Sequence, residues 1–225
     1  MRKRGELFVF EGPDGVGKST LSAEFTARLR SYDIETEHLS FPGREEGTLG
    51  RLVYDLHHAP ADCGVQTVSA ASLQTMHIAA HLDAIERRIL PALSAGKNVV
   101  LDRFWWSTWV YGIVGGVSAS LLKTLLHVER ECWGKVVPKT ADLVTKAHSW
   151  RQDESDGTWQ QLAITYRELA QAERSRYPVE LVSNENSLEV ALETVLEAAR
   201  SHSSSKRLQV LAQVELEPQA EKKRR

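Results

Sequence analysis

The sequence predicts an α/β fold in which a parallel five-stranded sheet is covered by helices on both faces. Five short apolar runs rich in strand-forming residues alternate along the chain with segments whose apolar residues recur at helical spacing. Strands and helices that alternate in this order build three layers, with the parallel sheet in the middle. Ligands of such folds bind at the carboxyl ends of the strands, so site residues are expected where the strands end.

The apolar runs, and the glycines and prolines that interrupt them, place the elements along the chain. Strands are expected at residues 7–10, 34–41, 98–101, 142–147 and 179–182. Helices are expected around residues 21–29, 49–56, 68–95, 121–126, 158–174 and 187–200. Pro42 and Gly43 end the second strand, and Gly96 ends the longest helix.

Composition and charge place the chain among ordinary globular proteins. Of its 225 residues, 42% are hydrophobic and 26% are charged, and the net charge is −2. This charge creates no overall basic field, so no nucleic-acid partner is expected. Cys63 and Cys132 form no CxxC pair, which is typical of a reducing compartment. No apolar run approaches the roughly 20 residues that span a bilayer, so we expect a cytoplasmic protein without a membrane partner.

The length suits one domain, which we place at residues 1–200. From residue 201 the composition shifts to Ser, Lys, Glu and Gln, and the chain ends in four basic residues. Such a segment buries too little apolar surface to fold. We therefore expect residues 201–225 to form a disordered tail, and a solvated tail is favoured over one that binds an acidic partner.

A glycine-rich loop after the first strand carries the GxxxxGK[ST] pattern of a phosphate loop, or P-loop. Its glycines let several backbone N–H groups face one phosphate, and the following helix adds partial positive charge. Lys18 would reach the β- and γ-phosphates of ATP, and the Ser19 hydroxyl can bind Mg²⁺. The residues expected to bind ATP are Gly12, Pro13, Asp14, Gly15, Val16, Gly17, Lys18, Ser19 and Thr20. The motif predicts a three-layer P-loop NTPase fold, but it does not separate a kinase from an ATPase or a GTPase.

An acid and an arginine, Asp102 and Arg103, follow the third strand. In a parallel sheet this strand ends beside the phosphate loop, where Asp102 can hold Mg²⁺ directly or through water. The guanidinium of Arg103 can bind a phosphate with two hydrogen bonds. A structural ion pair at the strand end is the alternative. The sequence therefore assigns Lys18 and Asp102 as catalytic residues, and Ser19 and Asp102 as the metal site.

Three segments together resemble the thymidylate kinase family of nucleoside monophosphate kinases. Residues 10–20 are similar to its FEGxDGxGKST loop, including the acid inside the loop. Residues 41–44 are similar to its FPxR segment, and residues 102–111 to its DRYxxSxxAY segment. The likeness covers residues 7–200, which identifies this part of the chain as a P-loop nucleotide kinase domain.

The resemblance implies that the γ-phosphoryl group of ATP is transferred to a nucleoside 5′-monophosphate, most directly dTMP, in nucleotide biosynthesis. ATP and Mg²⁺ are then the cofactors, and small-molecule nucleotides are the partners. Asp14 would touch the 3′-hydroxyl of the deoxyribose, while Arg44 and Arg103 would hold the acceptor phosphate. Such catalysis depends on positioning and charge neutralisation. Many relatives form homodimers, so a homodimer is implied as one state open to this chain.

The positions that would face the base depart from the family pattern. An Arg on the long helix, four residues after an aromatic residue, is usual there, and this chain has His77 and His81. Gly112 stands where Gln is usual. His81 can still donate a hydrogen bond to a pyrimidine carbonyl. The residues implied to bind the acceptor are Asp14, Arg44, His77, His81, Arg103, Ser107 and Tyr111.

The candidate lid, residues 146–157, is short, polar and acidic, and it offers Lys146 and Arg151 as cations. We assign Arg151 as the catalytic arginine that stabilises the transferring phosphoryl group; a solvated loop arginine is the alternative. The altered base pocket favours a second hypothesis, a deoxynucleoside or modified-nucleotide kinase on the same fold. The short lid favours a third, a non-catalytic ATP-binding regulatory relative.

Two further clusters have both a site interpretation and a packing interpretation. The first contains His57, His58, His77 and His81. No HExxH or Cys-rich spacing supports a zinc site there, so pocket or core histidines are favoured. The second is aromatic and follows the Asp–Arg pair: Phe104 and Trp105 are the expected base-stacking residues, with helix packing as the alternative for the tryptophans.

Overall fold

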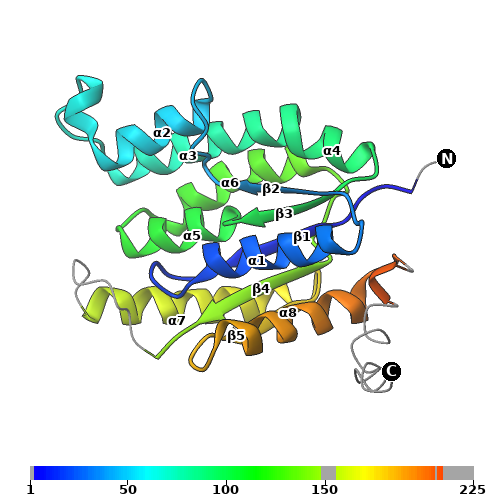
Figure 1. The fold of residues 1–225 in the computed structure, drawn as a ribbon. Coiled ribbons are helices and arrows are strands. Elements are labelled where there is room, and N and C mark those ends of the chain that lie inside the picture. The colour runs from blue at the N-terminus through cyan, green and yellow to red at the C-terminus, as the bar shows by residue number, and fades with distance from the viewer. Residues whose placement is uncertain (1–2, 148–155, 206, 210–225) are drawn as a thin grey trace, which may run out of the picture.

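Five parallel strands form one sheet at the centre of the structure (Figure 1). The computed structural model describes residues 3–147, 156–205 and 207–209. The strands are β1 (Leu7–Glu11), β2 (Thr36–Ser40), β3 (Asn98–Asp102), β4 (Thr140–Thr145) and β5 (Val179–Ser183). They lie in the order β2-β3-β1-β4-β5, and each neighbouring pair is parallel. The predicted α/β fold with a parallel five-stranded sheet is confirmed.

Helices connect the strands and cover both faces of the sheet (Figure 1). They are α1 (Lys18–Ser31), α2 (Leu49–His58), α3 (Ala70–Ala84), α4 (Leu90–Ser94), α5 (Trp105–Val114), α6 (Ala119–Trp133), α7 (Asp156–Glu173) and α8 (Leu188–His202). Several begin where the sequence supplies a hydroxyl cap. Ser69, Ser118 and Ser187 each accept a hydrogen bond from a backbone N–H in the first turn of α3, α6 and α8.

Alternate strand residues face two separate hydrophobic cores, one on each side of the sheet. In β1, Leu7 and Val9 belong to one core, while Phe8 and Phe10 belong to the other. Helices α1 and α8 fill the second core and pack against each other, whereas α5, α6 and α7 supply most of the helical side chains of the first. Burial on both faces explains why the strands are almost continuously apolar.

The long helix expected at residues 68–95 is helical almost throughout, but it is interrupted. After α3 a π-helical turn, η2 (Ile85–Ile89), leads into α4. Pro91 has no N–H to donate to the carbonyl four residues earlier, which explains why the regular helix is interrupted just before it. Gly96, with φ of +88°, then ends the helix as predicted. Helix α5 was not predicted.

The chain beyond residue 200 continues to contact the domain. Helix α8 extends to His202, and the backbone N–H of Ser204 donates to Oε1 of Glu6 at 2.8 Å. Leu208 is buried in the core that contains α1 and α8. Residues 201–205 and 207–209 therefore lie against the domain where a disordered tail was expected, and the rest of that tail lies outside the described residues. None of the described helices is both long and apolar enough to cross a membrane.

Candidate active site

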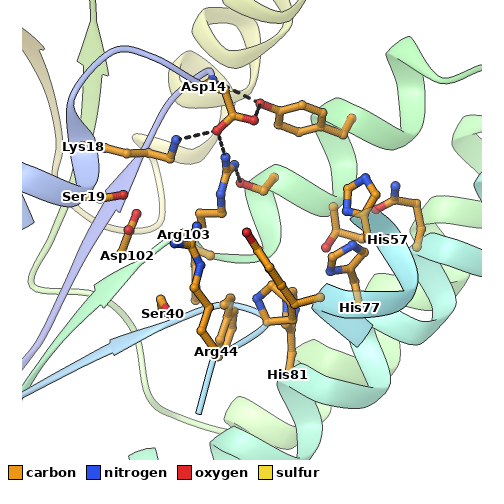
Figure 2. A pocket seen from close by; sticks show the side chains of 18 of the residues that line it. Asp14, Lys18, Ser19, Ser40, Arg44, His57, His77, His81, Asp102 and Arg103 are labelled. Carbon is orange, nitrogen blue, oxygen red and sulfur yellow. Dashed lines mark hydrogen bonds and ion pairs between the residues drawn. The ribbon is translucent and has the colours of Figure 1, made fainter. Parts of the chain in front are cut away.

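A cavity of about 150 Å³ lies at the carboxyl ends of β2 and β3, between the phosphate loop and helices α2, α3 and α5 (Figure 2). Most of the predicted site residues meet there. Those that line the cavity are Asp14, Lys18, Ser19, Arg44, His77, His81, Asp102, Arg103, Ser107 and Tyr111. The predicted catalytic arginine, Arg151, and most of the candidate lid lie outside the described residues.

The phosphate loop joins β1 to α1, as its motif predicts. Gly12 and Gly17 have φ of 143° and 87°, and a Cβ on either would lie 2.4 Å from a neighbouring atom. For Gly17 that atom is Nδ2 of Asn184, which donates to the carbonyl of Val16 at 2.8 Å. Asn184 directly follows β5, so a strand end two positions away in the sheet helps to fix the loop; this residue was not predicted.

Lys18 opens α1 and is almost completely buried. Its Nζ is 3.2 Å from Oδ1 of Asp14 and 3.2 Å from the carbonyl oxygen of Pro13. Burial and the positive charge of Arg103 lower the pKa of Lys18 to about 8, while Asp14 opposes the shift. An additional anion beside Lys18 would raise this pKa again and hold the ammonium in its charged form.

Asp14 links the phosphate loop to α5. The Tyr111 hydroxyl donates to Oδ2 of Asp14 at 3.0 Å and accepts from its backbone N–H at 3.2 Å. The guanidinium of Arg103 forms an ion pair with Oδ1. Burial acts to raise the pKa of Asp14, but the charges of Arg103 and Lys18 outweigh it and hold that pKa well below its usual range. One carboxylate is therefore shared by two cations and a phenol (Figure 2).

Arg103 has a backbone conformation that is uncommon for a residue with a side chain, with φ of +72°. Its backbone N–H donates to the carbonyl of Phe10 at 2.9 Å, and its Nη1 donates to the Ser107 hydroxyl at 2.9 Å. Glu11 accepts from the backbone N–H of Phe104 at 2.6 Å and of Ser107 at 3.0 Å. Phe10 and Glu11 of β1 thus bind the backbone at Arg103 and directly after it, which holds the residue in its uncommon conformation.

Glu11 is fully buried, and it was not predicted as a site residue. Its Oε2 accepts from the backbone N–H of Gly12 at 3.3 Å and from the hydroxyls of Ser107 at 2.8 Å and Tyr166 at 3.2 Å. Burial raises the pKa of Glu11, although Arg103 and these donors oppose the rise. The signal in the sequence was an acid directly before the phosphate loop, at a position where a buried strand ends.

The predicted metal residues fit a divalent cation. Asp102 is 8% exposed, and its Oδ1 has no hydrogen-bond partner among the residues that the structure describes. Asp102 and Ser19 line the same cavity, on the side of Lys18 (Figure 2). Carboxylate and hydroxyl oxygens are ligands that Mg²⁺ accepts, and a buried unpartnered oxygen needs such a partner.

Histidine rings form the other end of the cavity. His77 contacts the rings of His57 and His81, with centroids 5.3 Å and 6.2 Å away. Burial and these neighbouring imidazoles lower the pKa of His77 to about 3, so its ring is neutral at physiological pH. Among the residues with described positions, no group of three or more His, Cys, Asp or Glu side chains could hold a metal. These histidines line the wall of the cavity.

His81 is tied down more firmly than its neighbour. Its Nδ1 is 3.0 Å from Oε2 of the fully buried Glu129, and its ring stacks on Phe41 with centroids 3.9 Å apart. When Nδ1–H donates to Glu129, Nε2 of the neutral ring is an acceptor. In that tautomer Nε2 has no hydrogen to donate, so it does not make the expected hydrogen bond to a pyrimidine carbonyl.

The aromatic cluster after Arg103 divides between the cavity and the core. Phe104 lines the cavity. Trp105 is buried in the hydrophobic core with Arg130 4.5 Å from its ring centroid, and Trp106 donates its Nε1–H to the hydroxyl of Tyr177 at 3.0 Å. Trp105 does not line the cavity, so the expected stacking of Trp105 on a base is not supported, and the packing interpretation applies to it.

Comparisons with known proteins agree with this geometry. A family model described as thymidylate kinase matches residues 10–128, which is more than half of the chain. The thymidylate kinase of Chlamydia muridarum is 34% identical over 122 residues, which cover 54% of this chain and 57% of that protein. The thymidylate kinase of Afipia carboxidovorans is 36% identical over 126 residues, or 55% and 53% of the two chains. The chain thus spans about half the length of the curated relatives it matches.

A solved structure extends the likeness of the fold over more of the chain. The crystal structure of thymidylate kinase from Ehrlichia chaffeensis matches with a TM-score of 0.67. The match covers 85% of this chain and 97% of that one at 20% sequence identity. At this identity the match concerns the fold, which is a P-loop NTPase fold with a parallel five-stranded sheet.

Proposed function

Because the chain belongs to the thymidylate kinase family, we propose that it transfers the γ-phosphoryl group of ATP to a nucleoside 5′-monophosphate, with dTMP as the preferred acceptor. The observation that carries the proposal is the ion-pair network of Lys18, Asp14 and Arg103. Lys18 belongs to the donor loop, Arg103 follows the neighbouring strand, and Asp14 joins them. The cations for a donor and for an acceptor phosphate are thereby held in one cavity, as in-line transfer requires.

On the donor side, Lys18 and the N–H groups of the loop would bind the phosphates of ATP. Asp102 and Ser19 would hold Mg²⁺, which supplies charge neutralisation between the donor phosphates when it is bound. The buried, unpartnered Oδ1 of Asp102 supports this assignment. The lowered pKa of Lys18 fits a residue that is fully charged only when an anion is present.

On the acceptor side, Arg44 and Arg103 would bind the 5′-phosphate. The guanidinium of Arg44 lies 4.8 Å from the ring centroid of Tyr54, and Arg103 is oriented by Ser107 and Asp14. An incoming phosphate would share Arg103 with Asp14, whose carboxylate is then available to a sugar hydroxyl. The other proposed acceptor contacts are His77, His81, Ser107 and Tyr111. Arg151 is proposed to stabilise the transferring phosphoryl group.

The test is ADP formation by the purified protein with Mg²⁺ and ATP, against dTMP, dUMP, dCMP, dAMP, dGMP and thymidine. We expect the highest kcat/KM for dTMP and none for thymidine, which lacks the phosphate that Arg44 and Arg103 would bind. Lys18→Ala is the matched inactive control. Phosphorylation of thymidine in preference to dTMP would refute the assignment of a nucleotide acceptor.

The histidine-lined end of the cavity favours a second candidate, a deoxynucleoside or modified-nucleotide kinase. His77 and His81 stand where the family usually carries an aromatic residue and an Arg that face the base, and burial lowers the pKa of His77 so that its ring is neutral. Fast turnover of a base-modified monophosphate with slow turnover of dTMP would select it. ATP binding without any transfer would select a regulatory relative instead.

Small-molecule nucleotides are the proposed partners and the cytoplasm is the proposed location. A homodimer is proposed from the family alone. Sedimentation equilibrium of the purified chain would decide its oligomeric state, and a mass of 25.2 kDa at all concentrations would refute the dimer.

A further inference from the structure

One polar side chain of the cavity is not used by the proposed mechanism. Gln74 lies in α3, is 6% exposed and lines the cavity. Its carboxamide makes no hydrogen bond with any residue that the structure describes. Neither amide atom is among the fully buried atoms that lack a partner, so the carboxamide is accessible from the cavity. A side chain that is more than nine-tenths buried and unpaired in a cavity wall is suited to a ligand that supplies the missing partners.

The packing of the neighbouring helix explains why this amide comes from α3. Gly112 of α5 lies against Leu122, and a Cβ there would be 2.7 Å from its Cδ2 and 3.4 Å from Cγ of Gln74. A side chain at residue 112 would therefore have to displace the end of Leu122. Cγ of Gln74 lies close to Gly112. The family usually carries a Gln at that position of α5, and in this chain an amide side chain reaches the same place from α3.

The surroundings of Gln74 restrict what it can pair with. His77 stands one turn further along α3, and His57 faces it from α2. Burial lowers the pKa of both rings, so these two neighbours of Gln74 are uncharged near neutral pH. A carboxamide offers one acceptor and one donor side by side, and it pairs with a neutral edge that offers the same two in the opposite order.

We propose that Gln74 is the residue that recognises the base of the acceptor, by two hydrogen bonds to the N3–H and the adjacent 4-carbonyl of a thymine or uracil ring. The proposal rests on the proposed function, since it names the base that enters this cavity. The carboxamide oxygen accepts from N3–H, and the amide nitrogen donates to the carbonyl. Gln74 is thus a specificity-determining residue on α3, in place of one at position 112.

The test is equilibrium binding of dTMP, measured by calorimetry in the presence of Mg²⁺ and ADP, to the full chain and three variants. Gln74→Leu keeps the size of the side chain and removes both hydrogen bonds. Gln74→Glu keeps its shape but replaces the donor by an acceptor that repels the 4-carbonyl. Gln161→Leu, at an exposed position of α7, is the matched control for a Gln-to-Leu change on a helix.

We expect Gln74→Leu to weaken dTMP binding by about 10- to 100-fold, the range of a lost bidentate base contact. Its affinity for ATP and its Tm should both be little changed, because the amide makes no hydrogen bond with the described residues of the free protein. Gln74→Glu should weaken dTMP binding more than dCMP binding, since the 4-amino group of cytosine donates. A residue that only supports the fold would instead lower the Tm and weaken both nucleotides equally.

Unchanged dTMP affinity in Gln74→Leu, or a loss no larger than in Gln161→Leu, would overturn the proposal. So would a wild-type chain that binds no pyrimidine nucleotide. Turnover is measured in the same samples to keep the two proposals apart. A chain that binds dTMP through Gln74 but forms no ADP would refute the proposed kinase activity and leave the base contact standing.

Discussion

The carboxylate of Asp14 controls the charge of Lys18, and Asp14→Asn tests that link. In the native network the pKa of Lys18 is about 8, with Asp14 as the leading group that raises it against burial and Arg103. Removing an opposite charge at a separation of 3.2 Å shifts a pKa by about 1–3 units. The pKa of Lys18 in the variant is therefore expected at roughly 5–7.

The consequence is a change in how ATP binding depends on pH. At pH 7.5 about three quarters of the native chains carry a charged Lys18, against about one quarter or fewer in the variant. ATP binds best to the charged ammonium, so the association constant falls as the pH rises above the pKa of Lys18 in the free protein. That fall should begin near pH 8 in the native chain and 1–3 units lower in Asp14→Asn.

The assay is calorimetric binding of ATP with Mg²⁺ to both proteins between pH 5.5 and 9. Protonation of ATP itself is common to both proteins, so it cancels in the ratio of their affinities. Tyr111→Phe is the control: it removes a neutral hydrogen bond to Asp14 and keeps the charge of the carboxylate. The affinity of this variant for ATP should therefore depend on pH as it does in the native chain. A native-to-variant ratio that is constant across this range, or a variant profile displaced to higher pH, would refute the coupling.

Three further substitutions have outcomes that follow from single contacts. Lys18→Ala should abolish phosphoryl transfer while its circular dichroism stays native, and normal turnover would remove the phosphate loop from the reaction. Arg103→Ala should raise the KM of the acceptor by about 10- to 100-fold in steady-state kinetics, because charged hydrogen bonds to the acceptor phosphate are lost, and it should change the KM of ATP little. A raised KM of ATP with an unchanged KM of the acceptor would assign Arg103 to the donor. Asp142 is fully buried on β4, and burial raises its pKa to about 8. Between about pH 4 and 8 the folded chain therefore keeps the Asp142 proton, whereas the unfolded chain has released it. The free energy of unfolding falls as the pH rises through this window. The free energy of unfolding, measured with urea at pH 5 and pH 8, should fall by on the order of several kcal/mol in the native chain and stay nearly constant in Asp142→Asn. An equal fall in both proteins would contradict this assignment.

The sheet and most of the helices could be predicted because their signals are local. Buried parallel strands are short apolar runs, and the connecting helices repeat their apolar residues every three to four positions. Helix α5 escaped prediction because Trp105, Trp106 and Trp109 are residues that favour strands as readily as helices. Its helical state is decided by burial, with Trp106 and Val110, four residues apart, both fully enclosed.

The site was predicted as far as its motifs are contiguous in the chain. Lys18 and Asp102 follow from the phosphate loop and from a strand that ends beside it. The sequence did not point to Glu11, Asn184 or Gln74 as candidate-site residues, because each is placed there by contacts with a segment at least 38 residues away in the sequence. Such contacts depend on the register of strands and the rotation of helices, which no local pattern specifies.

The two proposed acceptor contacts, the guanidinium of Arg103 and the amide of Gln74, are held in place in different ways. A positive φ at a residue with a side chain costs about 1–3 kcal/mol, and it persists only where neighbouring contacts fix it. Phe10 and Glu11 do so from β1, the strand that leads into the phosphate loop, so the arginine and the loop are attached to the same strand. Gln74 and the histidines stand on two separate helices, α3 and α2. If Gln74 and the histidines contact the base as proposed, we expect substitutions on these two helices to change which base is accepted and to leave the Arg103 turn and the phosphate loop as they are.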